Sequence, residues 1–389
     1  MDKKILIIST AFPPRIGSGS KRVCSISNGL VDFGWKVFVL TLEKEYYDFE
    51  EEDENLISPK VRVFRTRAFL PKTGKDKSLW KMVIMALFHF ILIPDRFLAW
   101  FPFGFKKGME IIKKENIDII YSSAPSFSVH LLARKFKKKT GKKWIAEFRD
   151  PWTKNISFDK KFFIKRVIEK RMEKGVFKEC DKIISAGPHI TELNKHVFDR
   201  NFEKFHTISS GFNQENIVSK NHSIFTISYF GTNYPFFKDA FADFLGAVDY
   251  LLEKKMIEED KIKVNIFDRK NWLNHREALA EMKKSSVLLV MGLNSRGAEL
   301  IPGKLYEYLS VKKPILAIDK INSHLGRIVN RTNSGKVVSG KDAIAKTILE
   351  YYNNFYHGGI SHNPNYREIE RYNYKNICKE LSFLLDDLL

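Results

Sequence analysis

The sequence predicts an α/β protein made of two Rossmann-like domains that face a central cleft. The chain has 389 residues, which is too long for one ordinary core and fits two domains of about 150–200 residues each. Short apolar strands alternate with amphipathic helices along the chain, as in parallel sheets covered on both faces. This alternation stops once, in the polar stretch of residues 211–222, where we place the domain boundary.

The N-terminal domain is expected at residues 1–212, as the acceptor-binding half. It opens with a strand at Lys4–Ser9, a glycine-bearing loop and a helix at Ser20–Gly34. Further strands are expected at Lys36–Thr41, Lys60–Arg65, Ile117–Ser122, Lys143–Phe148, Lys182–Ala186 and Thr207–Ser210. Further helices are expected at Leu79–Ile93, Phe105–Glu115, Phe127–Thr140 and Lys160–Lys178.

The C-terminal domain is expected at residues 213–365, with strands that bring ligands to their carboxyl ends. These strands are Thr226–Phe230, Lys263–Phe267, Val287–Met291, Ile315–Ile318 and Val337–Val338. The helices are Asp239–Leu252, His275–Met282, Lys304–Leu309 and Ala343–Tyr351. The tail, residues 366–389, reads as two helices or one bent helix, and we expect it to pack back on the N-terminal domain.

Charge and cysteine content indicate the setting in which the protein works. The formal net charge is +20, of which residues 1–212 carry +16, so this half should attract nucleic acid or an anionic membrane surface. Three distant cysteines fit a reducing, cytoplasmic compartment. The start, Asp2-Lys3-Lys4 before a short apolar run, predicts no signal peptide. The longest apolar stretch, Leu79–Ile93, is shorter than the roughly 20 residues of a membrane span.

The loop Gly17-Ser18-Gly19 follows the first strand and opens the first helix. Glycines there allow close backbone approach to a ligand, and a helix N-terminus favours an anion. Arg22 stands where a dinucleotide fingerprint has its third glycine, which argues against a dehydrogenase. Taken alone, the loop leaves a ligand site and a plain tight turn both open.

A second candidate site is the segment Ala298–Leu309, where two glutamates lie on either side of a Pro302-Gly303 turn. We expect Glu299 in the loop and Glu307 on the helix, both able to face one ligand. The amides of Leu300, Ile301 and Gly303 and the Lys304 ammonium lie at the helix start, where a diphosphate is stabilised. Spacing alone also fits a surface helix with incidental glutamates. No metal-binding motif or nucleophile elbow is found, so we expect no metal and no cofactor.

These segments carry a family resemblance. The Glu-x7-Glu segment followed by "KKPILAI" resembles the donor site of retaining glycosyltransferases of the GT-B fold, family four. The opening "ILIISTAFPPRIGSGSKRV" resembles the first loop and helix of that family, and "ISYFGTNYP" its nucleotide-binding domain. The segment "WIAEFRDPW" resembles members that assemble bacterial surface polysaccharides. The match covers both halves in the expected order.

The resemblance implies a metal-independent, hexosyltransferase-type enzyme that moves a sugar from a nucleotide-diphosphate sugar to a glycan or lipid-linked glycan. It implies that Glu307 holds the ribose and Glu299 the transferred sugar. It implies that Lys304 neutralises the diphosphate, that Glu299 and Lys304 also take part in catalysis, and that Gly17 and Gly19 bring the backbone of the N-terminal domain to the phosphate and the acceptor. The other donor-binding residues implied are Gly231, Thr232, Asn233, Lys238, Leu300, Ile301, Pro302 and Gly303. Arg149 and Asp150 lie where related enzymes often place a histidine, which leaves the catalytic residue of the N-terminal domain open; Arg149 is assigned to the acceptor and Asp150 to catalysis.

Two other functions stay open at this point. A basic protein that stacks nucleobases on aromatic side chains would explain the charge, although no nucleic-acid module is found and we expect no nucleic acid. A sugar-nucleotide epimerase or hydrolase would use the same fold without an acceptor.

The stretch from Leu79 to Phe103 is rich in aromatic residues. It fits a core helix, but its aromatics and the surrounding lysines also fit an interfacial helix on anionic lipid. We expect peripheral binding to the inner face of the plasma membrane through Trp100 and Phe101.

Overall fold

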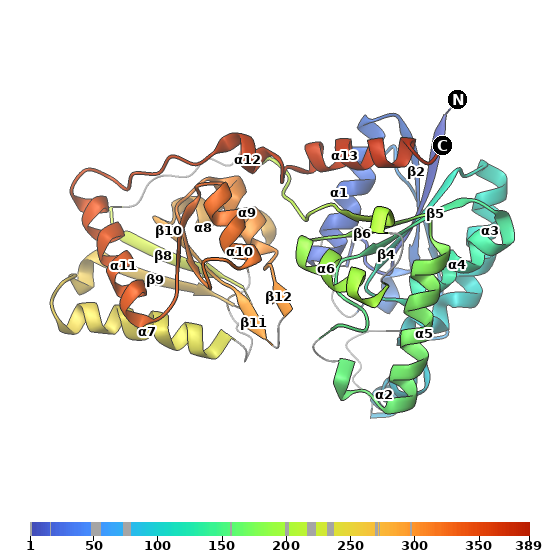
Figure 1. Ribbon diagram of the computed structural model, residues 1–389, viewed down its shortest axis with the longest axis horizontal. Helices are drawn as coiled ribbons and strands as arrows, with labels where there is room; N and C mark the ends of the chain where they lie inside the picture. The colour runs from blue at the N-terminus through green and yellow to red at the C-terminus, as the bar shows by residue number, and fades with distance from the viewer. Residues whose placement is uncertain are drawn as a thin grey trace. The chain divides into compact units, whose positions relative to one another are not determined.

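The computed structural model describes residues 2–15, 17–47, 56–72, 79–155, 158–198, 202–215, 223–231, 237–268, 271, 273–295 and 298–389. The chain forms two compact units, Met1–Ser210 together with Tyr374–Leu389, and Gly211–Asn373. The boundaries expected from the sequence were at residues 212 and 365. Both units are α/β (Figure 1).

The first unit is built on a seven-stranded, all-parallel sheet with the order β3-β2-β1-β4-β5-β6-β7. Its strands are β1 (Lys3–Ile8), β2 (Trp35–Leu42), β3 (Arg62–Thr66), β4 (Ile119–Ala124), β5 (Lys143–Phe148), β6 (Lys182–Ser185) and β7 (Phe205–Thr207). Its helices are α1 (Ser18–Asp32), α2 (Leu79–Ile91), α3 (Phe101–Glu115), α4 (Ser128–Thr140), α5 (Phe163–Glu179), α6 (Pro188–Val197) and α13 (Tyr374–Asp386).

The sheet is buried on both faces, which explains why its strands read as continuous apolar runs. Ile5, Leu6, Ile7 and Ile8 of β1 are fully buried, and they divide alternately between two cores. Helices α1 and α13 cover one core, and α3, α4 and α5 cover the other. The C-terminal helix α13 packs on α1, so the last helix of the chain completes the first unit (Figure 1).

The membrane surface expected at Trp100 and Phe101 is wrong. Trp100 is 1% exposed, and its indole Nε1 donates a hydrogen bond to Thr66 Oγ1 at 2.6 Å. Phe101 is half-buried and packs against the same core. Helix α2 differs, because it carries several exposed apolar side chains, among them Trp80 and Phe90. The end of the aromatic stretch, at Trp100 and Phe101, therefore belongs to the core, whereas its beginning, α2, lies on the surface.

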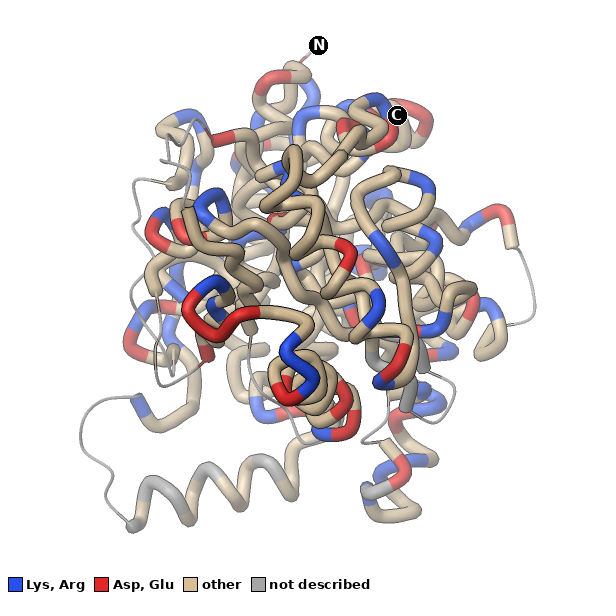
Figure 2. Tube along the Cα trace, turned by 90° about the vertical axis from the view of Figure 1, so that its left-hand side faces the viewer, with Lys and Arg blue, Asp and Glu red and all other residues tan. Residues whose placement is uncertain are grey.

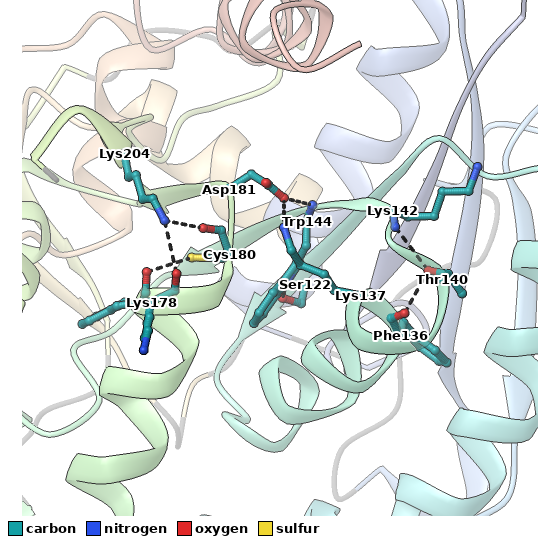
Figure 3. Close-up of polar contacts among 11 residues, drawn as sticks. Ser122, Phe136, Lys137, Thr140, Lys142, Trp144, Lys178, Cys180, Asp181 and Lys204 are labelled. Carbon is teal, nitrogen blue, oxygen red and sulfur yellow. Dashed lines mark hydrogen bonds and ion pairs between the residues drawn. The ribbon is translucent and has the colours of Figure 1, made fainter.

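The amino ends of β5 and β6 are fixed by a polar cluster. Asp181 accepts hydrogen bonds from the Trp144 amide, at 2.7 Å, and from Lys137, while the Lys204 ammonium donates to the carbonyl of Cys180 at 2.9 Å (Figure 3). Lys204 thereby binds the last carbonyls of α5, where a cation is favoured by the helix dipole. These contacts fix the amino ends of the two strands. The carboxyl ends of the strands lie at the opposite end of the sheet.

The second unit has a five-stranded parallel sheet with the order β14-β13-β10-β8-β9. Its strands are β8 (Phe225–Phe230), β9 (Ile262–Phe267), β10 (Val287–Met291), β13 (Ile315–Ile318) and β14 (Gly335–Val338). A separate hairpin joins β11 (Leu293–Ser295) and β12 (Ala298–Leu300). Its helices are α7 (Lys238–Glu253), α8 (His275–Lys284), α9 (Lys304–Val311), α10 (His324–Arg331), α11 (Lys341–Tyr356) and α12 (Tyr366–Glu370).

Candidate functional site

The glycine loop after β1 lies against an arginine from another strand. Gly17 has φ +134°, a conformation that favours glycine. A Cβ on Gly19 would lie 2.8 Å from the guanidinium carbon of Arg149, closer than two such atoms can pack. The absence of a side chain at Gly19 therefore lets Arg149 reach the start of α1.

Arg22, the residue that breaks the dinucleotide fingerprint, has a structural explanation. It is 2% exposed, and its Nη2 lies 2.7 Å from Glu147 Oε1 on β5. The guanidinium also donates to the carbonyls of Ile208 and Ser209, at 2.8 and 2.7 Å. Burial alone would raise the pKa of Glu147, but Arg22 holds that pKa below its usual range. This buried pair ties α1 to the carboxyl end of the sheet, and breaking one partner of such a pair is strongly destabilising.

Arg149 and Asp150 follow β5 at this same edge. Arg149 donates from Nε to the Ala124 carbonyl at 3.1 Å and from Nη2 to the Pro125 carbonyl at 2.6 Å. Its Nη1 is buried without a hydrogen-bond partner among the residues that the structure describes. Asp150 is half-buried, and burial raises the pKa of its carboxyl, partly offset by Arg149. This edge of the first unit therefore holds a buried arginine donor without a partner among the described residues and, next to it in the chain, a half-buried carboxylate.

The next two residues of this loop are anchored by buried carboxylates on α5. Trp152 donates from Nε1 to Glu169 Oε2 at 2.8 Å, and Thr153 donates from its amide to Glu173 Oε1 at 3.2 Å and from its hydroxyl to Glu173 Oε2. Both glutamates are 0% exposed. Trp152 also stacks on Phe127, with ring centroids 4.7 Å apart. These anchors fix the loop so that Asp150 is held in place from both sides.

The anchor at Glu173 predicts a pH dependence of stability. Burial raises the pKa of Glu173 from 4.5 to about 7, so the stabilising, protonated form is fully present below pH 4.5 and is lost as the pH rises through 7. The wild type should lose about 3 kcal/mol relative to Glu173→Gln between pH 4.5 and 8.5. Urea unfolding followed by tryptophan fluorescence measures this difference, with exposed Glu253→Gln as the control. Parallel pH profiles of wild type and Glu173→Gln would contradict the prediction.

The C-terminal site lies at the start of α9. Glu307 is 15% exposed, and its carboxylate lies 2.7 Å from Lys304 Nζ and 3.6 Å from His275 Nδ1. The other ring nitrogen of His275 lies 3.0 Å from Glu215 Oε1. His275 begins α8, where the side chain of Asn274 caps the helix. Two helix starts therefore bring cationic or donor groups to one carboxylate.

Helix α9 is held against the strand ends by Tyr308. The Phe230 amide donates to Tyr308 Oη at 3.0 Å, and Tyr308 donates to the Leu289 carbonyl at 3.1 Å. Tyr308 is fully buried, so this bridge fixes α9 to β8 and β10. The start of α9, and with it Lys304 and Glu307, is thereby placed next to the turn at Gly231.

The structure brings the sequence-predicted residues together within each unit. Gly19, Arg149 and Asp150 meet in the first unit, and Lys304 and Glu307 in the second. Lys238 is exposed at the first position of α7. Leu300 ends β12, and Ile301, Pro302 and Gly303 form the turn into α9.

Glu299 was expected in the loop before α9, and the structure places it instead in strand β12, where its backbone pairs with Asn294 of β11. Thr232 and Asn233 lie outside the described residues.

Sequence reasoning missed His275 and Glu215. The spacing Asn274-x-x-Glu277 is a capping-box signal that marks the helix start at His275. No local pattern reveals that Glu307, far along the chain, lies beside it.

Among the described residues, no three metal-ligating side chains lie close enough together to hold a metal ion. None of the helices described is long and apolar enough to cross a membrane.

Comparison with known proteins identifies the fold. No family model and no curated protein matches the sequence. The structure is similar to sucrose-phosphate synthase from Thermosynechococcus elongatus, with TM-score 0.63, 14% identity and 99% of each chain covered. It is similar to HepE from Anabaena in complex with UDP, with TM-score 0.62, 11% identity, and 99% of this chain and 100% of that chain covered. It is also similar to WaaG, a glycosyltransferase involved in lipopolysaccharide biosynthesis, with TM-score 0.52, 10% identity, and 96% and 95% covered. The chain has the GT-B fold, with two Rossmann-like domains, as the sequence predicted.

Proposed function

We propose that the protein is a retaining glycosyltransferase that moves a sugar from a nucleotide-diphosphate sugar to a glycan or lipid-linked glycan of a surface polysaccharide. The observation that carries this proposal is the start of α9, where Glu307 and Lys304 lie together at a helix N-terminus beside the ends of parallel strands. The GT-B fold and its likeness to HepE, which binds UDP, support the same ligand class.

In the proposed donor complex, Glu307 accepts hydrogen bonds from the ribose hydroxyls. Lys304 then turns from Glu307 toward the diphosphate, whose charge the N-terminus of α9 also stabilises. The bond between the anomeric carbon and the diphosphate oxygen breaks, and its electron pair leaves with the diphosphate. Positively charged and amide groups at this point stabilise the charge that develops in the transition state.

In the proposed acceptor complex, Arg149 and Asp150 act on the incoming hydroxyl. The diphosphate departs first, and the hydroxyl oxygen then forms the new bond to the oxocarbenium-like anomeric carbon from the face that the diphosphate has left, so the configuration is retained. The proton of the hydroxyl passes to Asp150. The raised pKa of the Asp150 carboxyl suits it to holding that proton. Arg149 Nη1, buried and without a partner among the described residues, is the donor that an acceptor oxygen would satisfy.

Thermal unfolding of the full chain with UDP-, GDP- and dTDP-sugars tests donor binding. One donor class is expected to raise the unfolding temperature in proportion to its occupancy, since a ligand that binds the folded state stabilises it. Release of free sugar from that donor without any acceptor would instead support an epimerase or hydrolase. Stabilisation by single-stranded nucleic acid, with none by any nucleotide sugar, would overturn the proposal.

Transfer is expected to continue in EDTA. Lys304 and the helix amides are proposed to fulfil the charge-neutralising role that a divalent cation has in other enzymes. The measurement is the transfer rate with the donor identified above, before and after dialysis against EDTA. Loss of the rate, with recovery on addition of magnesium or manganese, would show that the diphosphate is held by a metal ion.

A further inference from the structure

An exposed apolar surface lies on α2 and at the start of α5. The exposed residues of α2 are Trp80 (56%), Val83 (59%), Leu87 (50%), Phe90 (63%) and Ile91 (58%). Their spacing of three to four residues places them along one stripe of the helix.

The start of α5 continues this surface. Phe162, Phe163 and Ile164 are 68%, 74% and 72% exposed, and the rings of Phe90 and Phe162 lie 5.1 Å apart in an edge-on arrangement. Single exposed apolar residues are common on protein surfaces, but a contiguous group of this kind marks an interaction site. We call these eight residues, the five exposed on α2 and residues 162–164, the apolar tip.

The charges around the apolar tip are mostly basic, with one exposed acidic residue nearby, Asp159, which pairs with Arg166. The sequence of α2 contains one basic residue, Lys81, and no acidic residue, and the parts of α2 that are not grey are tan in Figure 2. On α5, the carboxylates of Glu169 and Glu173 are fully buried, as described above, whereas Lys170 and Lys174 are exposed. Lys170 and Lys174 follow Phe163 by seven and eleven residues, which places all three on one face of α5. An apolar end followed by a basic face is complementary to the acyl chains and headgroups of an anionic lipid leaflet.

We propose that the apolar tip and the basic face of α5 dock the N-terminal domain on an anionic membrane surface. Phe162, Phe163 and Ile164 insert at the boundary between headgroups and acyl chains, while Lys170 and Lys174 lie at the headgroups. This surface keeps the first part of the aromatic stretch that the sequence suggested, Trp80 and Phe90 included, and excludes Trp100 and Phe101, which are buried or half-buried.

The docking surface and the proposed acceptor loop share one helix. Glu169 and Glu173, which anchor Trp152 and Thr153, lie five and nine residues beyond Ile164, or about 7 and 14 Å along α5. A docked α5 would therefore hold the Asp150 loop close to the leaflet. If the proposed function is right, this distance suits an acceptor that is anchored in lipid.

Flotation of the full chain with vesicles tests the docking surface. Binding is expected to phosphatidylglycerol–phosphatidylcholine vesicles and not to phosphatidylcholine alone, and it should fall as salt rises. The double variant Phe163→Ser/Ile164→Ser should bind about tenfold or more weakly through lost apolar insertion. Lys170→Gln/Lys174→Gln should also lose about tenfold or more on anionic vesicles. Phe383→Ser, a similarly exposed residue of α13, is the matched control and should bind like the wild type.

Three results would overturn the docking surface. They are equal binding to neutral and anionic vesicles, wild-type binding by both double variants, and no vesicle binding with self-association that Phe163→Ser/Ile164→Ser abolishes. The last result would assign the apolar tip to a second copy of the chain. Unfolding temperature with the nucleotide sugar is measured for each variant, so that misfolding is recognised. Vesicle binding without nucleotide-sugar binding would leave the docking surface standing and reject the proposed function.

Discussion

Replacing Glu307 by alanine is expected to lower the transfer rate by about 30- to 1000-fold while the protein stays folded. Glu307 is the carboxylate at which Lys304 and His275 meet, and its proposed contact is with the nucleotide ribose. Truncating a hydrogen-bonded charged contact that is made both in the bound complex and in the transition state typically costs about 2–4 kcal/mol, which lowers kcat/KM by that range of factors. Most of the loss should be seen as weaker nucleotide binding, because the ribose does not change during the reaction.

Two further variants separate this role from a general loss of charge. Glu350→Ala removes a surface glutamate of α11 that pairs with Lys336, and it should transfer like the wild type, since exposed pairs contribute little. Glu299→Ala should lower transfer while affinity for the nucleotide alone is kept, because Glu299 is assigned to the sugar. Wild-type turnover by both Glu307→Ala and Glu299→Ala would reject the donor site.

The central strands could be predicted because a buried parallel strand has a distinctive sequence. β5 (Lys143–Phe148), β10 (Val287–Met291) and β13 (Ile315–Ile318) have the bounds that the apolar runs predict. Their side chains are buried on both faces of a sheet, so nearly every position is apolar or β-branched. The signal is local, and it does not depend on distant residues.

Two helices and the hairpin were not predicted. α6 (Pro188–Val197) and α10 (His324–Arg331) have ten and eight residues, the same lengths as α8 and α9, which the sequence did predict, so length is not the reason. The buried positions of α6 and α10 include polar residues, such as Thr191 and Asn194 in α6 and His324 in α10, so the apolar spacing that marks a helix is weak there. The β11–β12 hairpin has three residues in each strand, so its pattern cannot be told from a loop.

Pairing between distant residues was the other limit of the sequence. Arg22 was recognised as a departure from a glycine motif, but its partner Glu147 lies 125 positions away. Aromatic content likewise did not distinguish Trp100, which is core, from Trp80, which is exposed. Both residues are tryptophans in the same aromatic-rich stretch of the sequence. Only the tertiary fold decides which of them is exposed to solvent.

Gly19→Ala is expected to lower the transfer rate by about 100-fold and to leave nucleotide affinity within a few-fold of the wild type. The new Cβ would lie 2.8 Å from the guanidinium carbon of Arg149, so the arginine must move. Its bonds to the carbonyls of Ala124 and Pro125 would be strained or lost, and the Asp150 carboxylate would shift with it. A misplacement of about 1 Å at reacting groups can cost about 100-fold. The fold should survive, because the displaced group is the end of a flexible side chain.

The matched control is Gly246→Ala in the middle of α7. There the atoms nearest to the new Cβ belong to the Lys341 side chain, the first at 3.4 Å, which is an ordinary contact. Replacing a glycine inside a helix by alanine usually stabilises the helix. Steady-state kinetics, nucleotide titration and thermal unfolding are measured for both variants. If Gly19→Ala turns over like Gly246→Ala, the position of Arg149 does not matter to the reaction, and Asp150 loses its assigned role. If Gly19→Ala loses turnover while its nucleotide affinity and unfolding temperature stay unchanged, the residues at the carboxyl ends of the first sheet act on the acceptor. A defect in donor binding would have weakened nucleotide binding as well.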